Sequence, residues 1–127
     1  MKCEMSAKAR VNPTEDLERV IKSLSNLFDY DDLKIGEDCV SVSGGLESLL
    51  NFKESLKKRK IRSTARKILI KGVHQDLILF RLNKQAAFVG IPNLVEGGIS
   101  PLGDIEVKVE CDDVEAFIDW IAPEIKT

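Results

Sequence analysis

The stretch CEMSAKARV, residues 3–11, decides the fold class because apolar and polar residues alternate through it without a break. The odd-numbered positions are apolar, and the even-numbered positions, Glu4, Ser6, Lys8 and Arg10, are polar. A period of two predicts a β-strand with one face buried and the other in water. The sheet that contains this strand is therefore expected to keep one wet face.

A helix is predicted directly after this strand. The sequence NPTED, residues 12–16, combines a proline, capping side chains and two acids, which together favour a helix start. Apolar residues between Leu17 and Phe28 then recur at helical spacing, with charged residues between them. We expect this helix to end near Phe28.

Two more helices are predicted in the middle of the chain. The first follows Gly45 and has leucines at a period close to 3.6 residues. The second begins at Ser63, a residue type that caps helices well, and buries Ile68 and Leu69. Gly72 is the expected C-terminal stop of this helix.

The remaining elements complete an α+β pattern. The order is strand, helix, strand, two helices, two or three strands and a helix, without the regular alternation of a parallel sheet. We therefore expect one α+β domain over residues 1–127, with a largely antiparallel sheet covered by helices on one face. The other predicted elements are a strand around Val40, strands over 76–84, 86–90 and 104–111, an irregular segment over 91–103, and a helix over 114–122 capped by Asp112.

Cysteine usage and hydropathy restrict the class of protein further. The three cysteines, Cys3, Cys39 and Cys111, are odd in number and form no CxxC pair, so buried thiols are expected rather than disulfides or a zinc site. No apolar run approaches the roughly 18 residues of a membrane span. The first ten residues alternate in polarity and do not resemble a secretory signal, so we expect a cytoplasmic protein.

Positive charge is concentrated in LKKRKIRSTARKILIKG, residues 56–72. Residues 53–71 include nine Lys or Arg and one acid, whereas the rest of the chain has ten bases and twenty acids. Since one unbroken helix would place bases on both of its sides, we expect a break near Lys60. Such a surface attracts polyanions, because neutralised phosphates release their counterions and arginine can bind a phosphate with two hydrogen bonds. The predicted RNA-binding residues are Lys57, Lys58, Arg59, Lys60, Arg62, Arg66, Lys67 and Lys84.

Two other interpretations of the basic segment stay open at this point. It could be an ordinary solvated face, or a surface for an acidic protein partner. Segregation of the two charge signs favours a polyanion. Phe52 is the nearest aromatic residue in sequence, and no RNP-like or GXXG pattern is present, so stacking of single-stranded bases is disfavoured. Backbone and shape recognition of structured RNA is the favoured hypothesis.

No catalytic or metal site is predicted. Gly44 and Gly45 lie between a strand and a helix, where a turn is favoured over a phosphate loop because GxxxxGK[ST] is absent. His74 is the only histidine, and no GxSxG accompanies it. The acids of residues 29–32 are expected to form a solvated turn. We therefore predict a protein that is not an enzyme and needs no cofactor.

The segment RLNKQAAFVG, residues 81–90, has two interpretations. Asn83, Lys84 and Gln85 interrupt two apolar runs, which favours a turn between antiparallel strands. Alternatively, Lys84 and Gln85 lie beside the basic segment and extend one binding surface.

Five stretches together resemble an archaeal group, the uncharacterised protein family 0201. They are NPTEDLERV (12–20), LKKRKIRSTARKILIKG (56–72), LNKQAAFVG (82–90), SPLGDIEV (100–107) and FIDWIAP (117–123). The resemblance implies a fold like that of the large-subunit ribosomal protein that binds five-S RNA, with an antiparallel sheet and helices packed on one side. It also implies RNA binding and a homodimer, and it brings no catalytic residues. Where this family has an acid at the start of the third helix, the present chain has Ser63.

The combined prediction is a protein that binds structured RNA by neutralising phosphates and fitting their shape. The alternative is a protein-interaction module, with a homodimer as one form, whose basic face meets an acidic partner.

Overall fold

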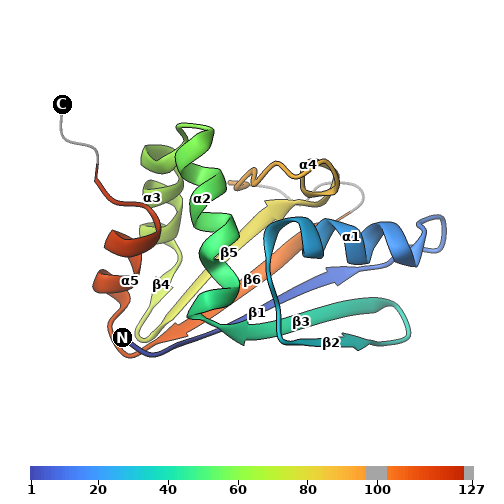
Figure 1. The fold of residues 1–127 in the computed structure, drawn as a ribbon. Coiled ribbons are helices and arrows are strands. Elements are labelled where there is room, and N and C mark those ends of the chain that lie inside the picture. The colour runs from blue at the N-terminus through green and yellow to red at the C-terminus, as the bar shows by residue number, and fades with distance from the viewer. Residues whose placement is uncertain (97–102, 125–127) are drawn as a thin grey trace.

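The computed structural model describes residues 1–96 and 103–124 and confirms the α+β class. Six antiparallel strands form one sheet in the order β2-β3-β1-β6-β5-β4, and the helices lie on one face of it (Figure 1). The strands are β1 (Cys3–Arg10), β2 (Asp32–Ile35), β3 (Cys39–Gly45), β4 (Val73–His74), β5 (Leu77–Asn83) and β6 (Asp104–Cys111). The helices are α1 (Leu17–Leu27), η1 (Leu46–Leu49, a 3-10 helix), α2 (Leu50–Lys58), α3 (Arg62–Lys71), α4 (Lys84–Phe88) and α5 (Val114–Ile121).

Strand β1 lies near the centre of the sheet and shows the predicted alternation. Every odd-numbered residue of this strand is buried and every even-numbered one is exposed. Ala7 is opposite Val42 of β3 on one side and Val107 of β6 on the other, so the apolar side chains of neighbouring strands share the helix-covered face. The predicted strand over 104–111 is confirmed as β6, which alternates in the same way from Ile105 onward, whereas Asp104 at its start is also buried.

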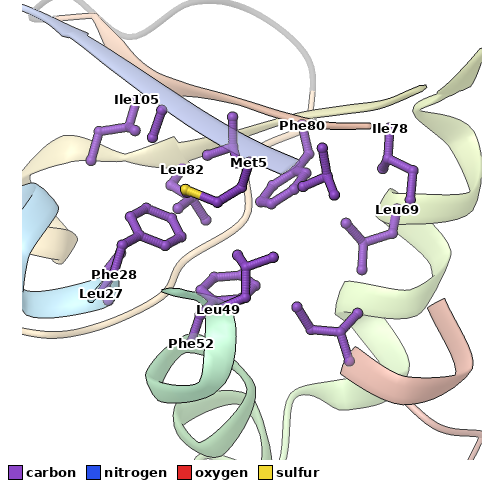
Figure 2. Packing of buried hydrophobic residues seen from close by; sticks show 14 of the residues in the cluster. Met5, Leu27, Phe28, Leu49, Phe52, Leu69, Ile78, Phe80, Leu82 and Ile105 are labelled. Atoms are coloured by element: carbon purple, nitrogen blue, oxygen red, sulfur yellow. The ribbon is translucent and has the colours of Figure 1, made fainter. Parts of the chain in front are cut away.

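Aromatic side chains from three elements meet in the core between the sheet and the helices (Figure 2). The ring of Phe52 in α2 lies 5.7 Å from that of Phe28 and 5.8 Å from that of Phe80 in β5. Offset and tilted aromatic pairs at such distances stabilise a core beyond the area they bury. Because Phe52 contacts rings from both sides, it fixes α2 over the sheet.

Helix boundaries differ from the prediction at several caps. Helix α1 begins at Leu17, later than NPTED suggests, because Asp16 accepts the hydrogen bond from the Glu18 N–H and acts as the N-cap. Asn12 instead makes a turn in which its N–H donates to Glu15 Oε1 at 3.0 Å. At α5 the cap is Asp113 rather than Asp112.

The two middle helices are confirmed, with a correction at the start of the second. Ser63 lies inside α3, whose N-cap is Ile61 and has no side-chain capping bond. Ile68 and Leu69 are buried as predicted, and Gly72 is the C-cap. The leucine pattern of the first middle helix is less regular than expected, because Leu50 is 47% exposed.

The strand predicted over 86–90 is wrong. Residues Lys84–Phe88 form the short helix α4, because the side chain of Asn83 accepts a hydrogen bond from the Ala86 N–H at 2.8 Å and starts a helix instead of a turn. The short strands β2 and β4 were not predicted. Strand β2 has only four residues, and although Leu33 and Ile35 alternate with Asp32 and Lys34, the whole strand is exposed and buries no apolar face.

The prediction of three buried thiols is wrong, because Cys3 and Cys111 are buried but bonded to each other and Cys39 is only half-buried. Cys3 and Cys111 are opposite each other on β1 and β6 and form a disulfide. Cys39 is a free thiol. Spacing along the chain could not indicate this pair, because 108 positions separate the two cysteines.

Replacing Gly72 by alanine is expected to destabilise the fold by about 2 kcal/mol. A Cβ atom there would overlap the carbonyl oxygen of Leu79, and this backbone oxygen cannot move without disturbing the sheet edge. Gly45→Ala is the matched control, because its Cβ would lie 3.8 Å from the Cys3 carbonyl oxygen, which is an ordinary van der Waals contact. Urea unfolding of both variants measures the difference, and equal stabilities would contradict this account of Gly72.

None of the helices in the described part of the chain has the length and apolar composition of a membrane span.

Candidate nucleic-acid interface

The turn between α2 and α3 has a defined backbone geometry. Helix α2 ends at Lys58, and the Arg59 and Lys60 N–H groups donate to carbonyls of its last turn at 3.1 and 3.2 Å. Lys60 has a φ of 57°, a left-handed conformation that is uncommon for a residue with a side chain. The predicted break near Lys60 is therefore confirmed. The Ile61 N–H, which donates to the Leu56 carbonyl at 3.2 Å, closes the turn.

This turn presents four consecutive cationic side chains to solvent. We call Lys57, Lys58, Arg59 and Lys60 the basic turn; all four are exposed. Within residues 1–96 and 103–124, none of them is in an ion pair. Figure 1 shows the basic turn at the end of α2 that is remote from the sheet. Two of the four also lie in the last turn of α2, where positive charge is favoured by the helix dipole.

The three predicted bases of α3 have different surroundings. Lys67 is exposed. Arg66 Nη1 donates to Asp119 Oδ1 at 2.8 Å and to the Ala122 carbonyl at 3.2 Å, so it joins α3 to the end of α5. Arg62 is half-buried, and its Nε has no hydrogen-bond partner among the described residues. Arg66 is therefore held by two acceptors at the end of α5, whereas Lys67 presents its ammonium to solvent and the Nε of Arg62 is buried.

Lys84 does not extend this surface. Its side chain is only 4% exposed, and its Nζ donates to the Arg10 carbonyl at 2.6 Å and to Glu15 Oε1 at 2.9 Å. A buried ammonium held by two acceptors supports the contact of α4 with the start of α1, and it is not presented to an external phosphate. We therefore leave Lys84 out of the interface, which corrects the hypothesis that placed it beside the basic segment.

The ion pair with Lys84 also affects the pKa of Glu15. Partial burial of its carboxylate raises the pKa, but hydrogen bonds and positive charge from Lys84, with further hydrogen bonds from Asn12, outweigh burial. The net effect lowers the pKa of Glu15 below its ordinary value. The Glu15 carboxylate is thus ionised near neutral pH.

One aromatic residue that no local pattern places near the basic segment, Trp120 of α5, lies beside the basic helices. The Nζ of Lys53 in α2 lies over the indole of Trp120, 5.6 Å from the ring centroid. The indole also lies 6.0 Å from the ring of Phe117 and is half-buried. Stacking is disfavoured on the sequence because Phe52 is the nearest aromatic residue along the chain, and the structure adds Trp120 as an aromatic residue that is near in space. Only the packing of α5 against α3 brings Trp120 there, and no local pattern encodes that packing.

The other candidate residues do not form a site. His74 is exposed on the short edge strand β4. No group of three or more His, Cys, Asp or Glu side chains in the described segments could hold a metal ion. A Cβ on Gly44 would overlap the hydroxyl of Ser48, so close packing accounts for this glycine without an anion.

Comparison with known proteins places the chain in a family. A family model described as RNA binding matches residues 4–111. A UPF0201 protein from Methanothermobacter thermautotrophicus is 41% identical over 122 residues, which cover 96% of this chain and 92% of that protein. The chain belongs to the UPF0201 family. A further UPF0201 protein, from Methanopyrus kandleri, is 43% identical and is covered over 80% of its length. The predicted family resemblance is confirmed.

Solved structures of UPF0201 proteins share the fold. The crystal structure of the Methanococcus jannaschii protein superimposes with a TM-score of 0.83 at 36% identity, covering 97% of this chain and 95% of that one. A second UPF0201 crystal structure gives a TM-score of 0.85 at 32% identity, covering 98% and 96%. The expected likeness to the ribosomal protein that binds five-S RNA stays a prediction.

Proposed function

We propose that this UPF0201 protein binds structured RNA through its phosphate backbone, with the basic turn as the main contact. The observation that carries the proposal is a run of four exposed cations, none of which has an ion-pair partner in the described chain. The RNA-binding description of the matching family model supports a nucleic acid as the polyanion.

The chemistry of the basic turn suits phosphates rather than bases. Lysine ammonium groups act as point charges with rotatable donors, and Arg59 can bind a phosphate with two parallel hydrogen bonds. Contacts of this kind fix position and orientation on a nucleic acid but carry no sequence information. We therefore expect recognition of RNA shape, with little dependence on sequence.

Helix α3 extends the proposed surface. Lys67 is exposed and available for a further phosphate contact, whereas Arg62 is half-buried and Arg66 holds α3 against α5. Because the contact of Arg66 with α5 already fixes the protein backbone of α3, RNA binding does not first have to order a flexible loop. This lowers the entropic cost of association.

The test is the affinity for a fluorescently labelled RNA hairpin as the salt concentration rises. Each phosphate contact on a duplex contributes a log–log slope of about −0.9, so about four contacts predict a roughly hundredfold loss between about 50 and 200 mM salt. Sodium polyglutamate serves as the competitor for the alternative of an acidic protein partner. Salt-independent binding, or competition by polyglutamate as effective as that by unlabelled RNA, would contradict the proposal.

A further inference from the structure

Trp120 offers an aromatic surface at the edge of the basic helices. Its indole is half-buried, with Phe117 packed on it from within α5 and the ammonium of Lys53 over its ring. A lysine in this position is held by a cation–π interaction that is weak at partly exposed sites. The ring is thus anchored, while the group that covers it sits on a flexible chain and can move.

An unsatisfied donor lies on the neighbouring helix. Arg62 Nε is buried without an acceptor among the described residues, which is costly for a polar N–H. Arg62 and Arg66 are one helical turn apart and so lie on the same side of α3. Arg66 contacts Asp119 and the Ala122 carbonyl, which flank Trp120 in sequence. This side of α3 therefore faces the end of α5 that carries the indole.

Asp119, the acid next to Trp120 in sequence, is not expected to repel an anion bound beside the indole. Asp119 is already paired with Arg66 at 2.8 Å, so its charge is compensated. Lys53 of α2 thus places a cation over the indole, while Arg66 of α3 is joined to Asp119 and to the Ala122 carbonyl at the same end of α5. An aromatic plane bordered by cations is the combination that binds single-stranded nucleotides, because the base stacks while the cations hold its phosphate.

We propose that Trp120 stacks with an unpaired base of the bound RNA, next to the duplex whose phosphates contact the basic turn. The ammonium of Lys53 leaves the indole and moves to the phosphate of this nucleotide, and the Arg62 side chain turns outward so that its Nε, which is buried in the unbound protein, donates to the same phosphate. The inference rests on the proposed RNA binding and adds the class of ligand: structured RNA with an unpaired segment.

Trp120 is the only tryptophan of the chain, so its fluorescence reports on this site alone. The test compares an RNA hairpin that has a short single-stranded overhang with the same hairpin ended bluntly. The overhang RNA is expected to quench the fluorescence and to bind about tenfold more tightly than the blunt RNA. Trp120→Ala is expected to bind both RNAs with the affinity of the blunt one, and Trp120→Phe, which keeps an aromatic face, to recover part of the difference.

The comparison of the two RNAs on the unaltered protein needs no variant, so loss of folding in Trp120→Ala leaves the test intact. Equal affinities and unchanged fluorescence with both RNAs would overturn the stacking inference while leaving backbone binding in place. Absence of binding to either RNA would overturn the proposed function itself.

Discussion

Replacing Lys58, Arg59 and Lys60 together by glutamate is expected to weaken binding to a structured RNA by about a hundredfold or more. The variant removes three phosphate contacts and places three like charges against the backbone. All three side chains are exposed and in no ion pair within the described residues, so the fold should be retained. Labelled RNA at low salt measures the affinity, and urea unfolding checks the fold.

The face of the sheet that no helix covers provides a control variant with the same change in net charge. Lys8, Arg10 and Lys108 are exposed on β1 and β6, far in sequence from the basic turn. Replacing these three by glutamate should change RNA affinity only a few-fold, through the overall field of the protein. If both triple variants lose affinity equally, total charge rather than the basic turn determines binding, and the assignment of the interface is wrong.

Lys84→Met is expected to lower the free energy of unfolding by about 3 kcal/mol while leaving RNA affinity unchanged. The substitution keeps the buried aliphatic volume but leaves Glu15, only 16% exposed, without its cation. Gln85→Met on the same helix is the control, because Gln85 is exposed. A stable Lys84→Met variant with weakened RNA binding would show that Lys84 belongs to the interface after all.

The pH dependence of the free energy of unfolding depends on the same ion pair, Lys84 with Glu15. Since the pKa of Glu15 is lowered in the folded state, the pair adds stability above the ordinary pKa of glutamate. This contribution is lost as the pH falls through the lowered folded-state pKa. Lys84→Met should therefore lose less stability between neutral and acidic pH than the unaltered protein.

Local sequence patterns were sufficient to predict the helices and strands whose side chains divide clearly into a buried and an exposed set. Strands β1 and β6 and helix α1 alternate or repeat along their whole length, and each was predicted close to its observed bounds. Helix α4 was mistaken for a strand because Asn83 suits both a hairpin turn and a helix N-cap. In that case the choice depends on tertiary contacts, among them the burial of Lys84 against Glu15.

The candidate interface was predictable in part. Segregated charge identified the basic turn, and an irregular charge pattern along one helix identified the break near Lys60. The pairing of Arg66 with Asp119 and the approach of Lys53 to Trp120 were not predictable, because each joins residues more than 50 positions apart. Both depend on how α5 packs on the helical layer.

The salt dependence of RNA affinity tests the basic turn most directly, because its slope counts phosphate contacts. The measurement compares the unaltered protein with a variant in which Lys57, Lys58, Arg59 and Lys60 are glutamine. The account predicts that the log–log slope of the variant is shallower by about three to four, close to one for each cation removed. Equal slopes for the two proteins would contradict it, because the basic turn would then hold no phosphate.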